Sequence, residues 1–298
     1  MDAAKAVAVL FTNGGAVEDY VQNRIEIKRK PLPLIAIPTT SGTGSEVTSV
    51  AVITNKKTDV KMMIKHPSFT PKIAIIDPIL TRSVPPHITA ATGIDALCHA
   101  IEAYISRVSQ PLTDVLALSA IGSIMKYLRI AYEDGDDMEA REAIMIASLQ
   151  AGVAFSNASV TLVHGMSRPI GALFYVPHGI SNAMLLPTVL DFTKDSSIKR
   201  LAEVGRSLNP DLQSYSDEEL ANYTISEIKK LCFDLRIPNL GEYGIEEVEF
   251  ENAISKMAKD AIESGSPNNN PRIPSYHEMK KLYRICFDYK YKSSVKTL

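Results

Sequence analysis

The sequence has no tryptophan and only three cysteines, Cys98, Cys232 and Cys286, which lie far apart and form no C-x-x-C pair. An odd, widely spaced set does not build a disulfide framework and is typical of reduced thiols in a cytosolic protein. We therefore expect three small, buried hydrophobic side chains and a cytoplasmic protein.

A strong net charge and a long apolar run are also absent. The net charge is −2, the pI is about 6.3, and no basic patch is interleaved with aromatic residues, so nucleic acid is not expected as a partner. No stretch reaches the roughly 18 apolar residues of a membrane span. Residues 1–11 mix charges of both signs, and their apolar run is too short for a signal peptide. No membrane partner is expected.

The 298 residues, 45% of them apolar, suffice for two domains. An alanine-rich helix is expected over residues 1–11, buried strands over 33–38 and 72–78, and a hairpin over 50–54 and 60–64. From residue 85 onward the periodicity is helical, over residues 87–107, 111–131, 139–156, 197–208, 217–235, 246–263 and 276–288. We place a domain boundary near residue 86, between an α/β domain over 1–86 and an all-helical domain over 87–298.

A loop rich in hydroxyl groups follows the first expected strand. Residues 39–48 contain two glycines, and Thr43-x-x-Glu46 has the form of a capping box, which predicts the start of a short helix. A strand, a Gly/Thr loop and a helix N-terminus together can bind phosphate. However, Gly42-x-Gly44 lacks the third glycine of a dinucleotide fingerprint, and no Walker lysine is present. A capped turn without a ligand remains the alternative.

Asp95 and His99 are four residues apart, so on a helix their side chains share one face. Alone, such a pair more often stabilises a helix than binds a metal. Two further histidines, His164 and His178, lie in a glycine-rich, apolar stretch, and each is followed by glycine. Three imidazoles and one carboxylate that converge in a helical domain would suit a divalent transition metal.

Several long motifs, in one order over nearly the whole chain, resemble the iron-containing, or group III, alcohol dehydrogenase family. They are residues 37–48 (IPTTSGTGSEVT), 89–102 (TAATGIDALCHAIE), 164–172 (HGMSRPIGA), 177–179 (PHG) and 270–272 (NPR). The resemblance implies a dehydroquinate synthase-like fold, in which an α/β dinucleotide-binding domain precedes an all-helical domain. It also implies a catalytic Fe²⁺, or Zn²⁺, between the two domains.

The resemblance also implies the site residues. Metal ligands fall on Asp95, His99, His164 and His178, which together form the catalytic site for the substrate oxygen. Contacts to NAD or NADP fall on Asp2, Thr39, Thr40, Gly42, Thr43, Thr48, Lys61 and Leu80.

Two departures from the family pattern stand out. The family's Gly-Gly-Gly-Ser phosphate loop should lie just upstream of Asp2, yet the sequence begins at Met1. We therefore expect only the C-terminal part of the dinucleotide-binding domain in this chain. The second departure is Arg168, where many members have a histidine close to the nicotinamide. An arginine does not accept a proton at ordinary pH, so any proton relay through this side chain must be replaced.

The sequence thus predicts a metal-dependent, NAD(P)-linked alcohol dehydrogenase that acts on a primary or small secondary alcohol, or its aldehyde or ketone. A divalent metal would lower the pKa of the alcohol and so permit hydride transfer, and the N₃O ligand set does not choose between Fe²⁺ and Zn²⁺. A catalytically inactive, metal-binding remnant is the alternative. A metal hydrolase is a third hypothesis, although it gives loop 39–48 no role. A homo-oligomer is expected.

Overall fold

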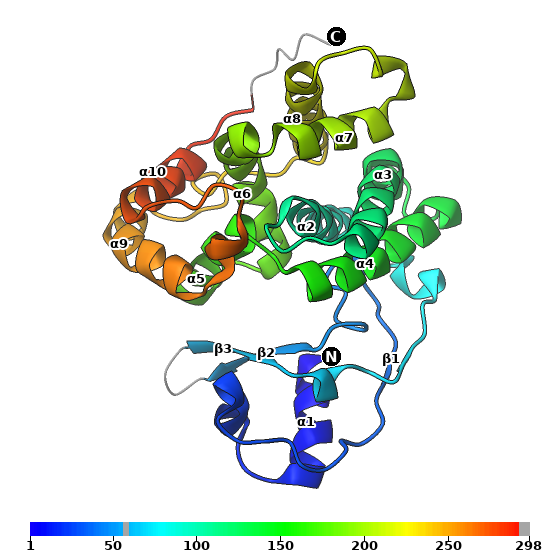
Figure 1. Cartoon of the computed structure of the whole chain (residues 1–298), viewed down its shortest axis with the longest axis vertical. Coiled ribbons are helices and arrows are strands. Elements are labelled where there is room, and N and C mark those ends of the chain that lie inside the picture. Colours follow the sequence, from blue (N-terminus) through cyan, green and yellow to red (C-terminus); the bar gives the residue numbers. More distant parts are fainter. Residues whose placement is uncertain (56–59, 292–298) are drawn as a thin grey trace.

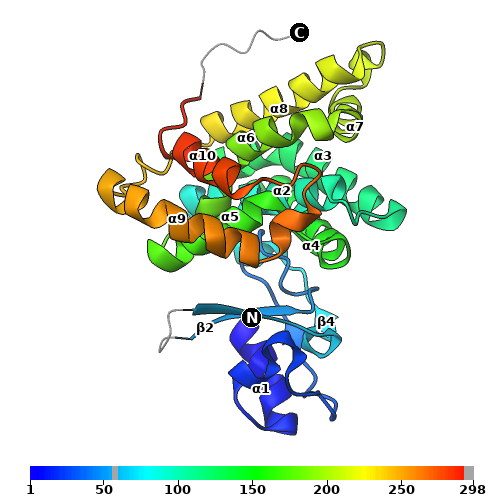
Figure 2. The same ribbon diagram turned by 60° about the vertical axis from the view of Figure 1, so that its left-hand side comes forward.

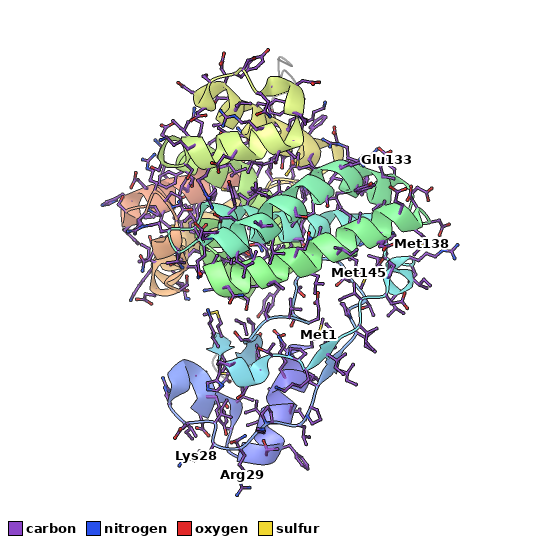
Figure 3. The ribbon with its side chains drawn as sticks, turned by 45° about the vertical axis from the view of Figure 1, so that its right-hand side comes forward. Met1, Lys28, Arg29, Glu133, Met138 and Met145 are labelled. Carbon is purple, nitrogen blue, oxygen red and sulfur yellow. The ribbon has the colours of Figure 1, made fainter. Side chains whose placement is uncertain are left out.

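The computed structural model describes residues 1–55 and 60–291, without the side chains of residues 22, 23, 60 and 61. A smaller N-terminal part, blue to cyan in Figure 1, lies beside a larger helical part. Figure 2 shows the strands between the first helix, α1 (Asp2–Asn13), and the helical part. In Figure 3, Met1 lies on the side of the N-terminal part that faces the helices, whereas Lys28 and Arg29 lie at its far end.

Helix α1 confirms the helix expected over residues 1–11. Its Lys5 is 1% exposed, and the ammonium group donates to Thr48 O, Thr48 Oγ1 and Val50 O at distances of 2.8 to 3.1 Å. Burial lowers the pKa of Lys5 to about 8, because the charged form loses its hydration. The ammonium group therefore fastens α1 to Thr48 and to Val50, the first residue of the following strand.

The expected strands are present but short. Strand β1 (Ile35–Ala36) pairs in parallel with β4 (Ile73–Ala74), and β2 (Val50–Asn55) pairs antiparallel with β3 (Val60–Lys65). The prediction that β1 and β4 are buried is wrong, since Ile35 is 54% and Ile73 52% exposed. Each of these strands has a single partner within residues 1–55 and 60–291, so each leaves one edge unpaired. The exposed isoleucines show that one face of the β1–β4 pair is also uncovered.

All seven helical ranges expected after residue 85 are confirmed, and two further helices were missed. The missed ones are α5 (Leu162–Leu173) and α6 (His178–Thr193), which each contain an internal proline. The others are α2 (Pro86–Ile105), α3 (Pro111–Glu133), α4 (Met138–Ala158), α7 (Ile198–Leu208), α8 (Asp217–Asp234), α9 (Glu247–Glu263) and α10 (Tyr276–Phe287). Short 3₁₀ helices are η1 (Val17–Asn23), η2 (Pro67–Phe69), η3 (Pro78–Thr81), η4 (Lys194–Ser196), η5 (Pro210–Leu212) and η6 (Ser266–Asn269).

Helix α2 lies at the centre of the helical part, where α3, α4 and α6 pack against it (Figure 1). Every residue from Gly93 to Ile105 is buried. A helix that is apolar on all sides is stable only inside a core, and α2 has this composition apart from a few ionisable residues. Those ionisable residues are therefore held in a region that excludes water.

Helix α3 is long and apolar enough to cross a membrane, with a mean hydropathy of 1.3 over its most apolar window. The sequence analysis, which looked for an uninterrupted run of apolar residues, did not single out this helix. Ala117, Ile121 and Leu128 are nevertheless 0% exposed and belong to the main hydrophobic core. We therefore assign α3 to the core of the helical part.

Loop 39–48 joins the N-terminal part to the helical part by close backbone packing. A Cβ atom on Gly44 would lie 2.5 Å from Gly152 Cα on α4, and one on Gly42 would lie 2.7 Å from Thr92 Cβ on α2. Gly44 has a φ of +59°, which interrupts a helical path. The helix predicted to start at Thr43 is therefore wrong, and the structure has a turn there.

We expect Gly152→Ala to destabilise the protein. The new Cβ would lie 2.9 Å from Gly44 Cα, and overpacking of this kind costs about 1 to 3 kcal/mol. Gly122→Ala on α3 is the matched control, since its Cβ would meet no atom within 4 Å and should stabilise the helix by up to about 1 kcal/mol. Denaturant unfolding measures both changes, and equal effects of the two variants would contradict the close packing.

We also expect the purified chain to self-associate through the uncovered β1–β4 face. Ile35, Ile37, Ile73 and Ile75 are 45 to 54% exposed there, and unpaired strand edges favour association. The double variant Ile35→Lys with Ile73→Lys should shift the species seen by light scattering toward the monomer. Leu112→Lys with Val115→Lys is the control, because these α3 side chains are 77% and 67% exposed in the helical part. A monomer at all concentrations of the native chain would show the prediction to be wrong.

Candidate metal centre

Four side chains from three helices meet at the core of the helical part. Asp95 and His99 lie one turn apart on α2, His164 lies in the first turn of α5, and His178 is the first residue of α6. One ligand atom from each residue lies within 4.8 Å of those from the other three. The structure therefore brings together the four residues that spacing and resemblance had singled out.

The distances suit one shared cation. His99 Nε2 and His164 Nε2 are 2.9 Å apart, and Asp95 Oδ1 lies 3.7 Å from His164 Nε2 and 3.9 Å from His178 Nε2. Neighbouring ligands of an ion with bonds of about 2.1 Å are roughly 3 to 3.5 Å apart. Two imidazole nitrogens this close satisfy each other only if one carries a proton, whereas a shared cation satisfies both.

Burial sets the protonation of the ligands. It lowers the pKa of His99 to about 3 and lowers the pKa of His164 strongly, so both rings are neutral at pH 7 and can donate a lone pair. The Phe155 ring stacks on His99 at 4.2 Å between centroids and holds its plane. His99 Nδ1 is buried, and no described residue bonds to it. The side chain of His178 is 43% exposed, so the site opens on its side.

Glu102 holds His164 in place. This carboxylate on α2 is 1% exposed; its Oε2 contacts His164 Nδ1, and its Oε1 accepts from Thr161 Oγ1 at 2.9 Å and from Val163 N at 2.6 Å. A proton kept on Nδ1 leaves the lone pair of His164 on Nε2, which faces the other ligands. Burial raises the pKa of Glu102, and the bonds from Thr161 and Val163 oppose that rise.

Asn182 orients the other end of the site. Its Nδ2 donates to Asp95 Oδ1 at 2.6 Å and lies 3.1 Å from His164 Nε2 and 3.2 Å from His178 Nε2. Sequence reasoning missed both Glu102 and Asn182. The available signals were that Glu102 follows His99 by three residues and Asn182 follows His178 by four, so each lies on the face of its helix that carries a ligand.

Five of the residues expected to bind the dinucleotide, Thr39, Thr40, Gly42, Thr43 and Leu80, follow the strands of the β1–β4 pair. In parallel strands the carboxyl ends share one edge, so loop 39–48 after β1 and Leu80 after β4 lie near each other, at the edge where α/β sheets bind ligands. Thr39, Thr43 and Leu80 are exposed, while Thr40 is partly exposed and Gly42 is buried.

Two of the expected cofactor residues make internal bonds. Asp2 Oδ1 accepts from Ser45 Oγ and Asp2 Oδ2 from Val52 N, both at 2.8 Å, and Thr48 Oγ1 accepts from Lys5 Nζ. Asp2 and Thr48 thus hold loop 39–48 against α1 and β2. The side chain of Lys61 lies outside the described residues. Cofactor binding by all eight residues stays a prediction.

Nearly the whole chain matches known sequences. Residues 89–287 match "Fe-containing alcohol dehydrogenase family, C-terminal", and residues 1–78 match "Iron-containing alcohol dehydrogenase". The chain is 38% identical to the NADPH-dependent butanol dehydrogenase of Clostridium saccharobutylicum over 290 residues, which cover 96% of this chain and 74% of that protein.

Solved structures agree with this match. A 1,3-propanediol oxidoreductase superposes with a TM-score of 0.91 at 36% identity, over 96% of this chain and 74% of that one. The sulfoacetaldehyde reductase of Bifidobacterium kashiwanohense, in complex with NAD⁺, superposes with a TM-score of 0.86 at 32% identity, over 97% and 74% of the two chains. The chain thus spans about three quarters of the length of these relatives.

We expect Glu102→Gln to weaken metal binding by about 10- to 100-fold. The amide can donate a proton to His164 Nδ1, which favours the tautomer with a hydrogen on Nε2 and so removes that lone pair from the site. Competition with a chromophoric chelator measures the dissociation constant. Glu251→Gln on α9, an exposed change of the same kind, is the control and should leave it unchanged. Equal affinities of the Glu102→Gln variant and the native protein would contradict the role given to Glu102.

Proposed function

This chain belongs to the iron-containing alcohol dehydrogenase family, and we propose that it is a metal-dependent oxidoreductase. It transfers a hydride between NAD(P) and a primary or small secondary alcohol, or the corresponding aldehyde or ketone. The observation that carries the proposal is the convergence of Asp95, His99, His164 and His178 within 4.8 Å in a buried site that opens at His178.

The four residues would hold Fe²⁺ or Zn²⁺. Such an ion, when bound, supplies Lewis-acid polarisation of the alcohol oxygen, which otherwise holds its proton at neutral pH. The protein contributes a preorganised, largely dry setting: Glu102 fixes the tautomer of His164, Asn182 orients Asp95, and Phe155 keeps the ring of His99 in its plane. Preorganisation of this kind avoids reordering of polar groups during the reaction.

The dinucleotide would bind at the carboxyl end of the β1–β4 pair. Loop 39–48 supports this placement, because its exposed hydroxyl groups of Thr39 and Thr43 lie where α/β sheets bind nucleotides. The relatives support both cofactors, since one is described as NADPH-dependent and another as bound to NAD⁺. The proposal therefore covers NAD and NADP.

The substrate would enter on the open side of the site. His178 is the exposed ligand, so the alcohol reaches the centre past this side chain rather than through the core around α2. The relatives carry names for butanol, 1,3-propanediol and sulfoacetaldehyde, which differ in size and charge. The family thus supports the reaction type, and the residues around the site must set the choice of alcohol.

A cytoplasmic location and a homo-oligomeric state belong to the same proposal. Cys98, Cys232 and Cys286 are all buried free thiols, as expected for a reducing compartment. The uncovered β1–β4 face offers a surface for association.

We expect the metal-loaded chain to reduce NAD⁺ or NADP⁺ in the presence of small primary alcohols, as followed by absorbance of the reduced cofactor. Chelation should abolish turnover and added Fe²⁺ or Zn²⁺ should restore it, because the four-residue site is the expected origin of Lewis-acid catalysis. His99→Ala should lose about one bound metal and all turnover, whereas His87→Ala, an exposed change at the start of α2, should lose neither.

Calorimetry with NAD(P)H separates this function from its alternative. Nucleotide binding together with turnover supports the dehydrogenase. One bound metal without nucleotide binding or turnover would instead identify a metal-binding module that has lost the reaction.

A further inference from the structure

In the part of the chain that the structure describes, Arg168 is a partly buried cation without an oxygen partner. It lies on α5 one turn beyond His164, and its Nη2 donates to Met63 Sδ on β3 at 3.5 Å. A thioether is a weak acceptor, and a guanidinium carries five N–H donors. Within residues 1–55 and 60–291, no carboxylate forms an ion pair with Arg168, although the charge of Glu102 acts on it from a distance.

The other arginines that are partly or fully buried do have such partners. Each one in the described part of the chain donates to at least one oxygen atom. Arg129 donates to Asp234, Arg200 to Asp114 and Arg206 to Asp217. Arg141 donates to Thr89 Oγ1 and to the carbonyl oxygens of Val84 and Gly135. Arg168 is therefore the exception, and it is located between the metal-binding helix α5 and strand β3. Its N–H groups remain available to a ligand.

The balance of charges around the metal centre also indicates that Arg168 is available to an anion. The carboxylates of Asp95 and Glu102 are both buried, and a divalent cation among the four ligands would balance them. The charge of Arg168 then has no counterpart in the site. A guanidinium binds carboxylate, sulfonate and phosphate groups well, because its planar pair of donors matches two of their oxygens.

We infer that Arg168 binds an anionic group of the bound ligand and that the natural substrate is a short alcohol or aldehyde with a carboxylate, sulfonate or phosphate at its far end. This inference rests on the proposed function and narrows its substrate class. Arg168 follows His164 by four residues on α5, a rise of about 6 Å along the helix axis, so the anion site lies within reach of a short substrate held at the metal centre.

A phosphate of the dinucleotide has the same chemistry as a substrate anion. The substrate is the favoured source, because Arg168 lies on the helix that carries His164, whereas the expected phosphate contacts lie on loop 39–48. Cofactor affinity and substrate preference, measured on the same variants, distinguish the two sources.

The test compares a charged with a neutral substrate. For the metal-loaded chain, kcat/KM is measured with 4-hydroxybutyrate and with 1,4-butanediol. The anion should be preferred by at least about tenfold in the native protein. Arg168→Met keeps an unbranched apolar side chain without the charge and should remove that preference through KM for the anion, with the value for the diol changed by less than about threefold. Arg168→Lys should restore part of the preference.

Arg284→Met on α10 removes an exposed positive charge that pairs with Glu251 and is the matched control; it should keep the native preference. Calorimetric binding of 4-hydroxybutyrate to the native and Arg168→Met proteins is a readout independent of turnover. An unchanged preference and unchanged anion binding in Arg168→Met would overturn the inference. So would a loss confined to NAD(P)H affinity, which would assign Arg168 to the cofactor phosphates.

The result also separates this inference from the proposed function. Turnover of 1,4-butanediol by the native protein without a preference for the anion leaves the dehydrogenase intact and removes the role of Arg168. Absence of turnover with both alcohols removes the dehydrogenase, and loss of anion binding in Arg168→Met would then still support the anion site.

Discussion

The burial of ionisable side chains on one central helix is the constraint on which the rest of the structure depends. Helix α2 places Asp95, His99 and Glu102 in a region without water, where an unpaired charge is strongly unfavourable. The two carboxylates are compensated by groups from outside α2: Asn182 bonds Asp95, and the start of α5 bonds Glu102. The helical part therefore has to assemble around α2 for these groups to be tolerated at all, and the core and the metal centre form together.

Most of the helical part was predictable because helices with one solvent-exposed face show an amphipathic periodicity in their sequence. The prediction failed for α5 and α6, which contain Gly165, Pro169, Gly179 and Pro187, residue types that disfavour helix interiors. Tertiary packing overrides those local signals. A Cβ on Gly165 would lie 2.7 Å from the ring of Pro267, and one on Gly179 would lie 2.8 Å from Ala91 O, so small residues are needed where these helices meet their neighbours. The strands were predicted from short apolar runs, which indicate burial but do not show the pairing partners. The exposure of Ile35 and Ile73 is expected only once neighbouring strands are taken to be missing.

Helical spacing in the sequence predicts which site residues are neighbours on one helix, but not which residues meet across helices. Asp95 and His99 are neighbours on one helix, so their pairing follows from the sequence, while His164 and His178 entered through their number and surroundings. Glu102 and Asn182 act across helices, and their roles depend on how α5 and α6 approach α2, which no local pattern encodes. The same limit applies to loop 39–48. Its glycines suggested phosphate binding, whereas the structure shows that Gly44 also permits contact between the N-terminal part and α4.

Helix α5 carries both a metal ligand and the cation that we propose to bind the substrate. Its first turn is tied to the buried carboxylate of Glu102 and presents His164 to the site, and one turn later it presents Arg168 toward β3. The backbone positions of the two residues are therefore set by one helix that is anchored in the core, not by a loop. In the role that we propose for Arg168, this helix would hold both a metal ligand and the partner of the substrate anion. The proposed preference for an anionic substrate would then depend on the same contacts with Glu102 that keep the lone pair of His164 in the site.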